Sequence, residues 1–124
     1  MIAVDTSSLV AYLTGQSGAD VDRLDEAVVS GDLALPPAVV TELFSDPGSA
    51  EWAEGQLSKF PLLAPTQGFW RRAGETRRML TKRGLKAKVA DALIAQSCID
   101  HDVALITRDR DFRHFARHCG LKLA

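Results

Sequence analysis

The apolar positions of this chain follow two different periods. Five short, mainly apolar runs predict β-strands: they lie at Met1–Val4, Leu33–Leu35, Leu62–Leu63, Val103–Ile106 and Leu121–Leu123. Longer segments repeat apolar residues every three or four positions and predict helices. These segments are Leu9–Thr14, Ala19–Ser30, Ala38–Ser45, Ala50–Lys59, Gln67–Arg83, Val89–His101 and Asp109–His118.

Capping and breaking residues agree with these boundaries. The hydroxyl-rich stretch Asp5–Ser8 is suited to cap a helix that follows the first strand. Pro36 and Pro37 stop the second strand and open the next helix, and Gly84 closes the longest one. Because strands alternate with helices, the sequence predicts one α/β domain over residues 1–124, with a central parallel sheet of about five strands and helices on both faces.

Composition narrows the class of protein. A chain of 124 residues with 46% hydrophobic and 25% charged residues fits a single compact domain. Its two cysteines, Cys98 and Cys119, lack the number and spacing of a disulfide framework or a structural zinc site. No secretory leader or membrane-spanning apolar run is visible. We therefore expect a reduced, cytoplasmic protein with no membrane partner.

Charge is distributed unevenly although the net charge is only −1. Residues 1–58 hold one basic residue against ten acidic ones, whereas residues 59–124 hold fourteen basic and six acidic residues. The segment Arg71–Lys88 is the most basic, and it is either a solvated helix face or a track for phosphates. Phe69 and Trp70, just before it, are candidates for stacking on a ligand, although core packing is the commoner role.

Two aspartates directly follow predicted strands. Asp5 comes after Met1–Val4, and Asp109 comes shortly after Val103–Ile106. Side chains beyond the carboxyl ends of adjacent parallel strands face one crevice, so we expect these two to be neighbours. Clustered carboxylates repel one another unless a cation neutralises them, and hard oxygen ligands favour Mg²⁺ or Mn²⁺.

Two further acids lie on predicted helices among apolar residues. Glu42 is on a short helix that is apolar nearly all round, which predicts that the helix is mostly buried. A buried glutamate needs a partner, which is either a metal ion or an arginine in a salt bridge. Asp91 near the start of its helix is either an inward-facing ligand or a charge that complements the helix dipole.

Each aspartate also has a structural interpretation. Asp5 before three hydroxyl residues is a common helix cap. Asp109 can act as both helix cap and ligand, whereas Asp111 falls in the predicted first turn, where helix-dipole complementation explains it. We favour Asp109 as the site residue, with the Thr107 hydroxyl fixing its orientation through a hydrogen bond.

Four short motifs occur in a fixed order along nearly the whole chain. They are Asp5–Ser7, Glu42 after the second strand, Ala90–Ala95 and Leu105–Phe112. Together they resemble the PIN-domain ribonucleases, and among these the VapC-type toxins of bacterial and archaeal toxin–antitoxin pairs. The resemblance implies a five-stranded parallel sheet between helices and endonucleolytic cleavage of RNA.

The resemblance also implies a site. The family's acidic positions, which bind Mg²⁺ or Mn²⁺ and carry out catalysis, fall here on Asp5, Glu42, Asp91 and Asp109. Thr107 matches the accompanying hydroxyl, and Ser7 and Asp111 are supporting candidates. Ser7 stands where many members carry asparagine, and Phe44–Pro47 follows Glu42 where a glycine often ends the helix. Both departures concern the surroundings of the acids.

The implied partners are an RNA substrate, a homodimer and an antitoxin. The antitoxin is expected to cover the acidic pocket, with an arginine among its carboxylates, and to form a toxin–antitoxin hetero-oligomer. RNA is expected along a basic groove. The candidate contacts are Arg77, Arg78, Lys82 and Arg83.

Three other classes compete with a nuclease. A catalytically silent PIN-fold module that binds RNA or protein would not need all four acids. A phospho-acceptor receiver domain needs adjacent acids after the first strand and a lysine after a late one, where this chain has Thr6 and Arg108. A purely structural protein leaves a buried Glu42 unexplained.

Overall fold

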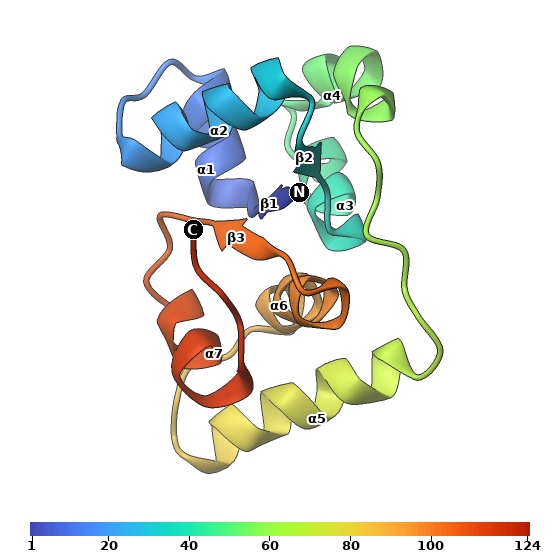
Figure 1. Cartoon of the computed structure of the whole chain (residues 1–124), viewed down its shortest axis with the longest axis vertical. Helices are drawn as coiled ribbons and strands as arrows, with labels where there is room; N and C mark the ends of the chain where they lie inside the picture. Colours follow the sequence, from blue (N-terminus) through green and yellow to red (C-terminus); the bar gives the residue numbers. More distant parts are fainter.

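A computed structural model describes residues 1–124, and its centre is a small parallel sheet. Strands β1 (Ile2–Val4), β2 (Leu33–Ala34) and β3 (Ala104–Ile106) lie in the order β2-β1-β3. In this register Ile2 pairs with both Leu33 and Ala104. Because all three strands are parallel, their carboxyl ends meet at one edge, where Figure 1 shows the chain passing from β1 into α1.

The expectation of about five strands is wrong, since only three form. The segments predicted as the third and fifth strands lie beside the sheet but pair at one residue each, Leu62 with Leu35 and Leu123 with Leu105. Pro61 and Pro65 bracket the first of these segments, and proline cannot donate a ladder hydrogen bond. The sheet is therefore flanked by single bridges rather than by full edge strands.

All seven predicted helical segments contain a helix. The helices are α1 (Thr6–Leu13), α2 (Ala19–Ser30), α3 (Pro37–Ser45), α4 (Ala50–Gln56), α5 (Phe69–Lys82), α6 (Val89–His101) and α7 (Phe112–Cys119), and a 3₁₀ turn at Leu57–Lys59 extends α4. In Figure 1, α1 and α2 lie on one side of the strands and α5, α6 and α7 on the other. The last helix begins at Phe112 rather than at Asp109 as predicted. No helix has the length and apolar character needed to cross a membrane.

Burial explains why the strands read as continuous apolar runs. All three residues of β1 are buried, as expected for a parallel strand covered on both faces. Leu9 and Leu24 pack in the core from α1 and α2, while Ile94 and Phe115 do so from α6 and α7. Helix α6 is buried over most of its length, so any polar residue in its first turn is held close to the core.

Candidate metal centre

Asp5 lies at the junction of β1 and α1. Its backbone N–H donates to the Ile106 carbonyl at 3.0 Å, which fixes it at the end of the sheet. Its side chain caps α1 by accepting the Ser8 backbone N–H at 3.1 Å, and the Ser7 hydroxyl donates to the same carboxylate. Asp5 is only 3% exposed, and this burial raises its pKa, with a further rise from Asp109. The capping role and the site role therefore fall on one carboxylate.

Thr107 joins Asp5 to Asp109. The Thr107 hydroxyl donates to Asp5 Oδ2 at 2.8 Å and accepts the backbone N–H of Asp109 at 3.0 Å. Asp109 Oδ1 in turn accepts the backbone N–H of Asp111 at 2.9 Å. Asp5 and Asp109 are neighbours, as predicted. The Thr107 hydroxyl bonds the carboxylate of Asp5 and the backbone N–H of Asp109.

Asp91 is the most perturbed acid of the group. It lies in the first turn of α6, is 9% exposed, and its Oδ2 is buried without a hydrogen-bond partner. Its pKa is raised to about 6, first by burial and then by the charges of Asp109, Glu42 and Asp5, while Lys88 acts in the opposite direction. A buried unsatisfied oxygen costs about 1–3 kcal/mol, and helix-dipole complementation does not require that cost. The position fits a cation ligand.

Three carboxylates come close enough to share an ion. One oxygen each from Asp91, Asp109 and Asp111 lies within 4.8 Å of the others. Ligand oxygens around one Mg²⁺ each lie about 2.0–2.1 Å from the ion, so this spacing is near that of a bound set. Asp111, which the sequence argument gives a supporting role, thus lies in the tightest group. Lys86 sits 3.2 Å from its Oδ2 and was not identified from the sequence.

Glu42 lies at the edge of this group. The expectation that it is mostly buried is wrong, because α3 packs on one side only: Val39 and Leu43 are buried, whereas Phe44 is exposed. Glu42 is half-buried and makes no ion pair with an arginine; its Oε1 accepts the Thr6 hydroxyl at 2.6 Å. Its charge still contributes to the raised pKa of Asp91.

An ion pair is linked to the acidic centre through Ser8. The Arg108 guanidinium bonds Asp20 at 2.8 Å, which lowers the pKa of that carboxyl to about 2. Asp20 also accepts the Ser8 hydroxyl at 2.8 Å, and the backbone N–H of the same serine donates to Asp5 Oδ1. Sequence reasoning missed this contact because Arg108 and Asp20 are 88 positions apart and no local pattern connects them.

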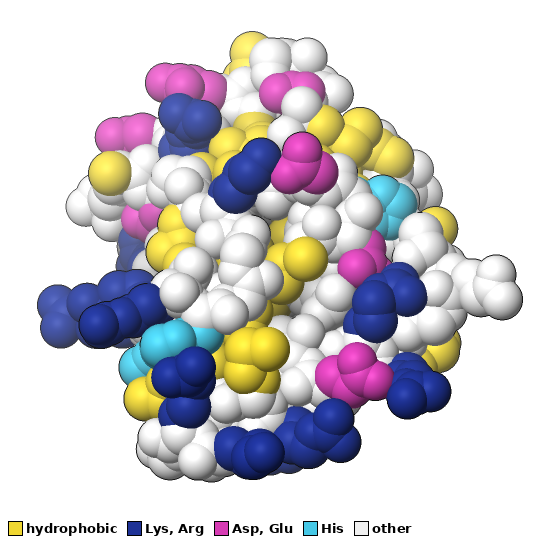
Figure 2. Space-filling view, turned by 60° about the horizontal axis from the view of Figure 1, so that its bottom comes forward, with side chains coloured by type: hydrophobic (Ala, Val, Ile, Leu, Met, Phe, Trp, Pro, Cys, Tyr) yellow, Lys and Arg dark blue, Asp and Glu magenta, His cyan; other side chains and the backbone are white.

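The basic segment divides into two kinds of residue. Arg72 bonds Asp100 at 2.7 Å, and Arg77 Nε donates to the Ala87 carbonyl at 2.7 Å, so both hold the fold together. The other basic residues of this segment are exposed. Figure 2 shows Lys and Arg side chains gathered along the lower part of the face that it draws, over α5. Arg78, Lys82 and Arg83 border a shallow hollow there. A solvated face explains these positions as well as RNA binding does, so the RNA role of all four candidates stays a prediction.

Comparison with known proteins adds a family and a fold. The family model described as the PIN domain matches residues 2–118. Among solved structures, VapBC2 from Rickettsia felis bound to a DNA fragment from its promoter is 22% identical, with a TM-score of 0.74 over 100% of this chain and 98% of that one. VapBC-1 from nontypeable Haemophilus influenzae is 19% identical, with a TM-score of 0.75 over 100% and 97%.

A third similar structure is a toxin–antitoxin complex from Klebsiella pneumoniae. It is 20% identical to this chain, with a TM-score of 0.70 over 98% of this chain and 95% of that one. At these identities the likeness is one of fold, and it extends over nearly the full length of each pair.

Proposed function

This chain belongs to the PIN-domain family, and on that premise we propose that it is a Mg²⁺- or Mn²⁺-dependent endoribonuclease and the toxin of a toxin–antitoxin pair. One observation carries the proposal. Asp91 Oδ2 is buried and has no hydrogen-bond partner, and its carboxylate lies within 4.8 Å of those of Asp109 and Asp111. Such an arrangement is costly without a cation and is suited to hold one.

Asp91, Asp109 and Asp111 are the residues that would hold the ion. A bound divalent ion supplies polarisation of the scissile phosphate and a lowered pKa of an attacking water. Thr107 keeps Asp109 at a fixed distance from Asp5 through its two hydrogen bonds. In this way the protein prepares a negatively charged centre before the substrate arrives.

Asp5 and Glu42 have roles beside the ion ligands. Asp5 is buried and fully hydrogen-bonded, so it adds negative charge without moving. Glu42 is half-exposed, and only its Oε1 accepts a hydrogen bond, so Oε2 is open to a water. We assign Glu42 Oε2 to orient that water and accept its proton as it attacks the phosphorus in line. The scissile P–O bond on the opposite side of the phosphorus then breaks, and the departing ribose oxygen takes a proton from solvent.

A catalytically silent PIN-fold module is the competing proposal. Such a module needs a surface for RNA or protein but no unsatisfied carboxylate in its core. Asp91 therefore favours the enzyme. The test is incubation of the purified chain with a structured RNA in Mg²⁺ or Mn²⁺: we expect internal cleavage that excess EDTA abolishes. Undiminished cleavage in EDTA would remove the metal from the mechanism, and intact RNA under all conditions would favour the silent module.

The proposed partner is a cognate antitoxin. The similar Klebsiella pneumoniae structure is a toxin–antitoxin complex, and an uncontrolled ribonuclease would harm the cell that makes it. An arginine of the antitoxin can replace the cation among Asp5, Glu42, Asp91 and Asp109, since a guanidinium bonds two carboxylate oxygens at once. We also propose a homodimer. Co-purification with the product of a small neighbouring gene, and the mass of the complex in solution, test both.

A further inference from the structure

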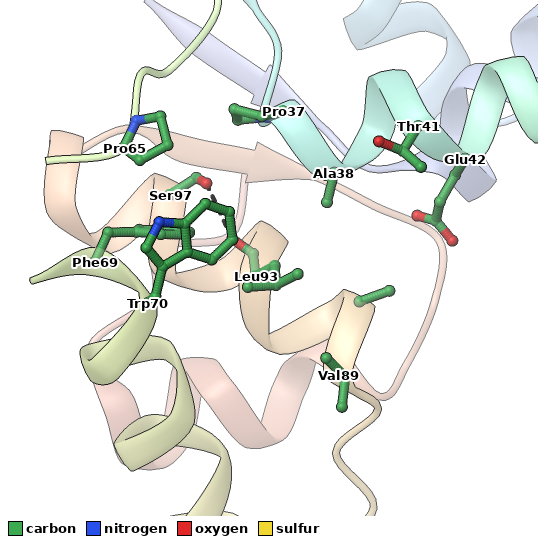
Figure 3. A pocket seen from close by; sticks show the side chains of 11 residues that line it. Pro37, Ala38, Thr41, Glu42, Pro65, Phe69, Trp70, Val89, Leu93 and Ser97 are labelled. Atoms are coloured by element: carbon green, nitrogen blue, oxygen red, sulfur yellow. Dashed lines mark hydrogen bonds between the residues drawn. The ribbon is translucent and has the colours of Figure 1, made fainter.

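An apolar groove runs from the acidic centre to the start of α5. It has a volume of about 310 Å³ and lies along α6, between α3 and α5. Figure 3 shows Glu42 and Val89 at one end and Trp70 and Pro65 at the other, with Leu93 between them. The groove therefore begins where the proposed reaction takes place.

Trp70 gives the far end an exposed aromatic surface. Its side chain is 67% exposed, whereas the neighbouring Phe69 is 3% exposed. The two rings meet edge to face, with centroids 4.9 Å apart and planes at 82°, so the buried ring holds the exposed one at a fixed angle. Packing does not explain a large apolar ring that stays this open to solvent.

Charge at both ends of the groove suits a phosphodiester chain. Lys88 is exposed, precedes Val89 and is near enough to Asp91 to lower its pKa. Arg71 follows Trp70, and its side chain is 87% exposed. Its Nε bonds Glu75 at 2.7 Å in an exposed ion pair, which leaves Nη1 and Nη2 for a phosphate. A strand with one phosphate at the metal centre and another near Arg71 crosses the groove, and the part of a nucleotide that suits an apolar, aromatic surface is its base.

Resting on the proposed ribonuclease activity, we propose that this groove is a nucleobase subsite, in which an unpaired base next to the scissile phosphate stacks on Trp70. The faces of a base inside a duplex are covered by its neighbours, so only a single-stranded or looped segment can present one. Stacking tolerates any base, because every base has a π-face.

The test uses the fluorescence of Trp70 itself. The chain has two tryptophans, and Trp52→Phe removes the other one, which lies on α4 away from the groove. Asp91→Asn is added to prevent turnover. The probes are a single-stranded RNA of about ten nucleotides, which is within the span of one single-strand-binding module, the same RNA in a blunt duplex, and an abasic version with the same phosphates.

We expect the single-stranded RNA to quench Trp70 emission and the duplex and abasic strands to do so weakly. In the same background, anisotropy of a labelled strand should show that Trp70→Ala lowers affinity about tenfold, while Trp70→Phe retains most of it. Equal binding of the abasic strand, or unchanged affinity in Trp70→Ala, would overturn the subsite. So would a Trp70→Ala variant that binds RNA normally but loses a co-expressed partner protein, since the groove would then dock a polypeptide.

Failure of the subsite and failure of the ribonuclease proposal give different results. Cleavage by the parent chain in Mg²⁺ with unchanged binding by Trp70→Ala would remove the subsite and leave the enzyme. Quenching by single-stranded RNA that the parent chain never cleaves would leave the subsite and remove the enzyme. Because Trp70 is exposed, the alanine variant is expected to melt at the same temperature as its parent.

Discussion

The acidic centre and the basic helix α5 carry opposite charges, and these charges differ in burial and in hydrogen bonding. Asp5 and Asp91 are buried, one saturated with hydrogen bonds and the other left with an unpaired oxygen. Along α5 the cations either bond within the protein, as Arg72 does, or extend into solvent, as Arg78 does. Only the acidic centre holds charge at a cost in stability.

This difference shows which charges can be assigned a function from structure. A solvated lysine or arginine costs little wherever it lies, so its position says little about its use. A buried carboxylate without a partner destabilises the fold, and its position needs another reason. The comparison predicts that neutralising Asp91 lowers the cleavage rate and raises the stability of the metal-free fold, whereas removing exposed cations changes RNA binding alone.

The largest expected effect is on cleavage. Asp91→Asn keeps the size of the side chain but removes a ligand charge, so we expect RNA cleavage to fall by roughly a hundredfold or more. The rate of RNA cleavage in Mg²⁺, with a circular dichroism spectrum to confirm the fold, measures this. Asp22→Asn on the exposed face of α2 is the matched control and should cleave like the parent. Asp5→Asn should lose nearly all activity too; parental rates in both site variants would mean that the reaction occurs elsewhere.

Thr107→Val should have the next largest effect. Valine has the same shape but cannot bond Asp5 Oδ2 or the Asp109 N–H, so the two acids lose their fixed spacing. Loss of such a supporting bond typically lowers metal affinity or activity by about 10–100-fold. Thr107→Ser keeps the hydroxyl and should recover most of the activity. Equal rates in the valine and serine variants would assign Thr107 to packing.

Mg²⁺ should stabilise the parent more than the Asp91→Asn variant. A ligand that binds only the folded state adds about 2.7 kcal/mol at a hundred times its dissociation constant. Thermal melting at pH 7.5 with and without Mg²⁺ should therefore show a rise in Tm for the parent and a smaller one for the variant. A parent whose Tm does not respond to Mg²⁺ would have no specific ion site.

The pH dependence of stability should also follow Asp91. Its pKa is about 6 in the folded chain against an ordinary value of 3.8 for an exposed aspartate, so the folded state binds more protons between these values. The stability from the protonated form is fully present below about pH 4 and is lost as the pH rises through 6, by roughly 3 kcal/mol. Urea unfolding should show that the free energy of unfolding of Asp91→Asn rises relative to that of the parent between about pH 4 and pH 6. Parallel profiles would mean that the carboxyl is not perturbed.

The smallest effect is expected on the basic face. Arg78→Glu with Lys82→Glu should weaken RNA binding, and each lost phosphate contact should flatten the salt dependence by about 0.7–0.9 in logarithmic slope. Both residues are exposed and neither forms an ion pair, so Tm and its response to Mg²⁺ should not change. Unchanged affinity across a salt titration would leave α5 as a solvated face.

Much of the architecture follows from periodicity along the chain. The helices α2 and α6 have the predicted boundaries because their apolar spacing and their ends are local properties. The meeting of Asp5 with Asp109 also follows, since both come after parallel strands that pair with each other. The single bridges at Leu62 and Leu123 do not follow, because the number of residues that pair at a sheet edge depends on its neighbours.

The environment of individual side chains depends on tertiary packing and is harder to predict. The exposure of Glu42 is set by which side of α3 faces the core. Phe69 and Trp70 are adjacent and both aromatic, yet successive positions on a helix point about 100° apart, so one is buried and the other is not. Asp111 and Lys86 come together only because the loop before α6 passes the start of α7.

The hydrogen bond from Thr107 to Asp5 closes a loop of 102 positions and has a consequence for folding order. We expect a contact of such long sequence separation to form after the nearby helices, because closing a long loop costs chain entropy before any bond offsets that cost. During synthesis β1 emerges first and must wait for β3 before the carboxylates can assemble. A partly made or partly unfolded chain therefore has no acidic centre, and exchange of the Asp5 amide hydrogen, which bonds Ile106, reports when the centre exists.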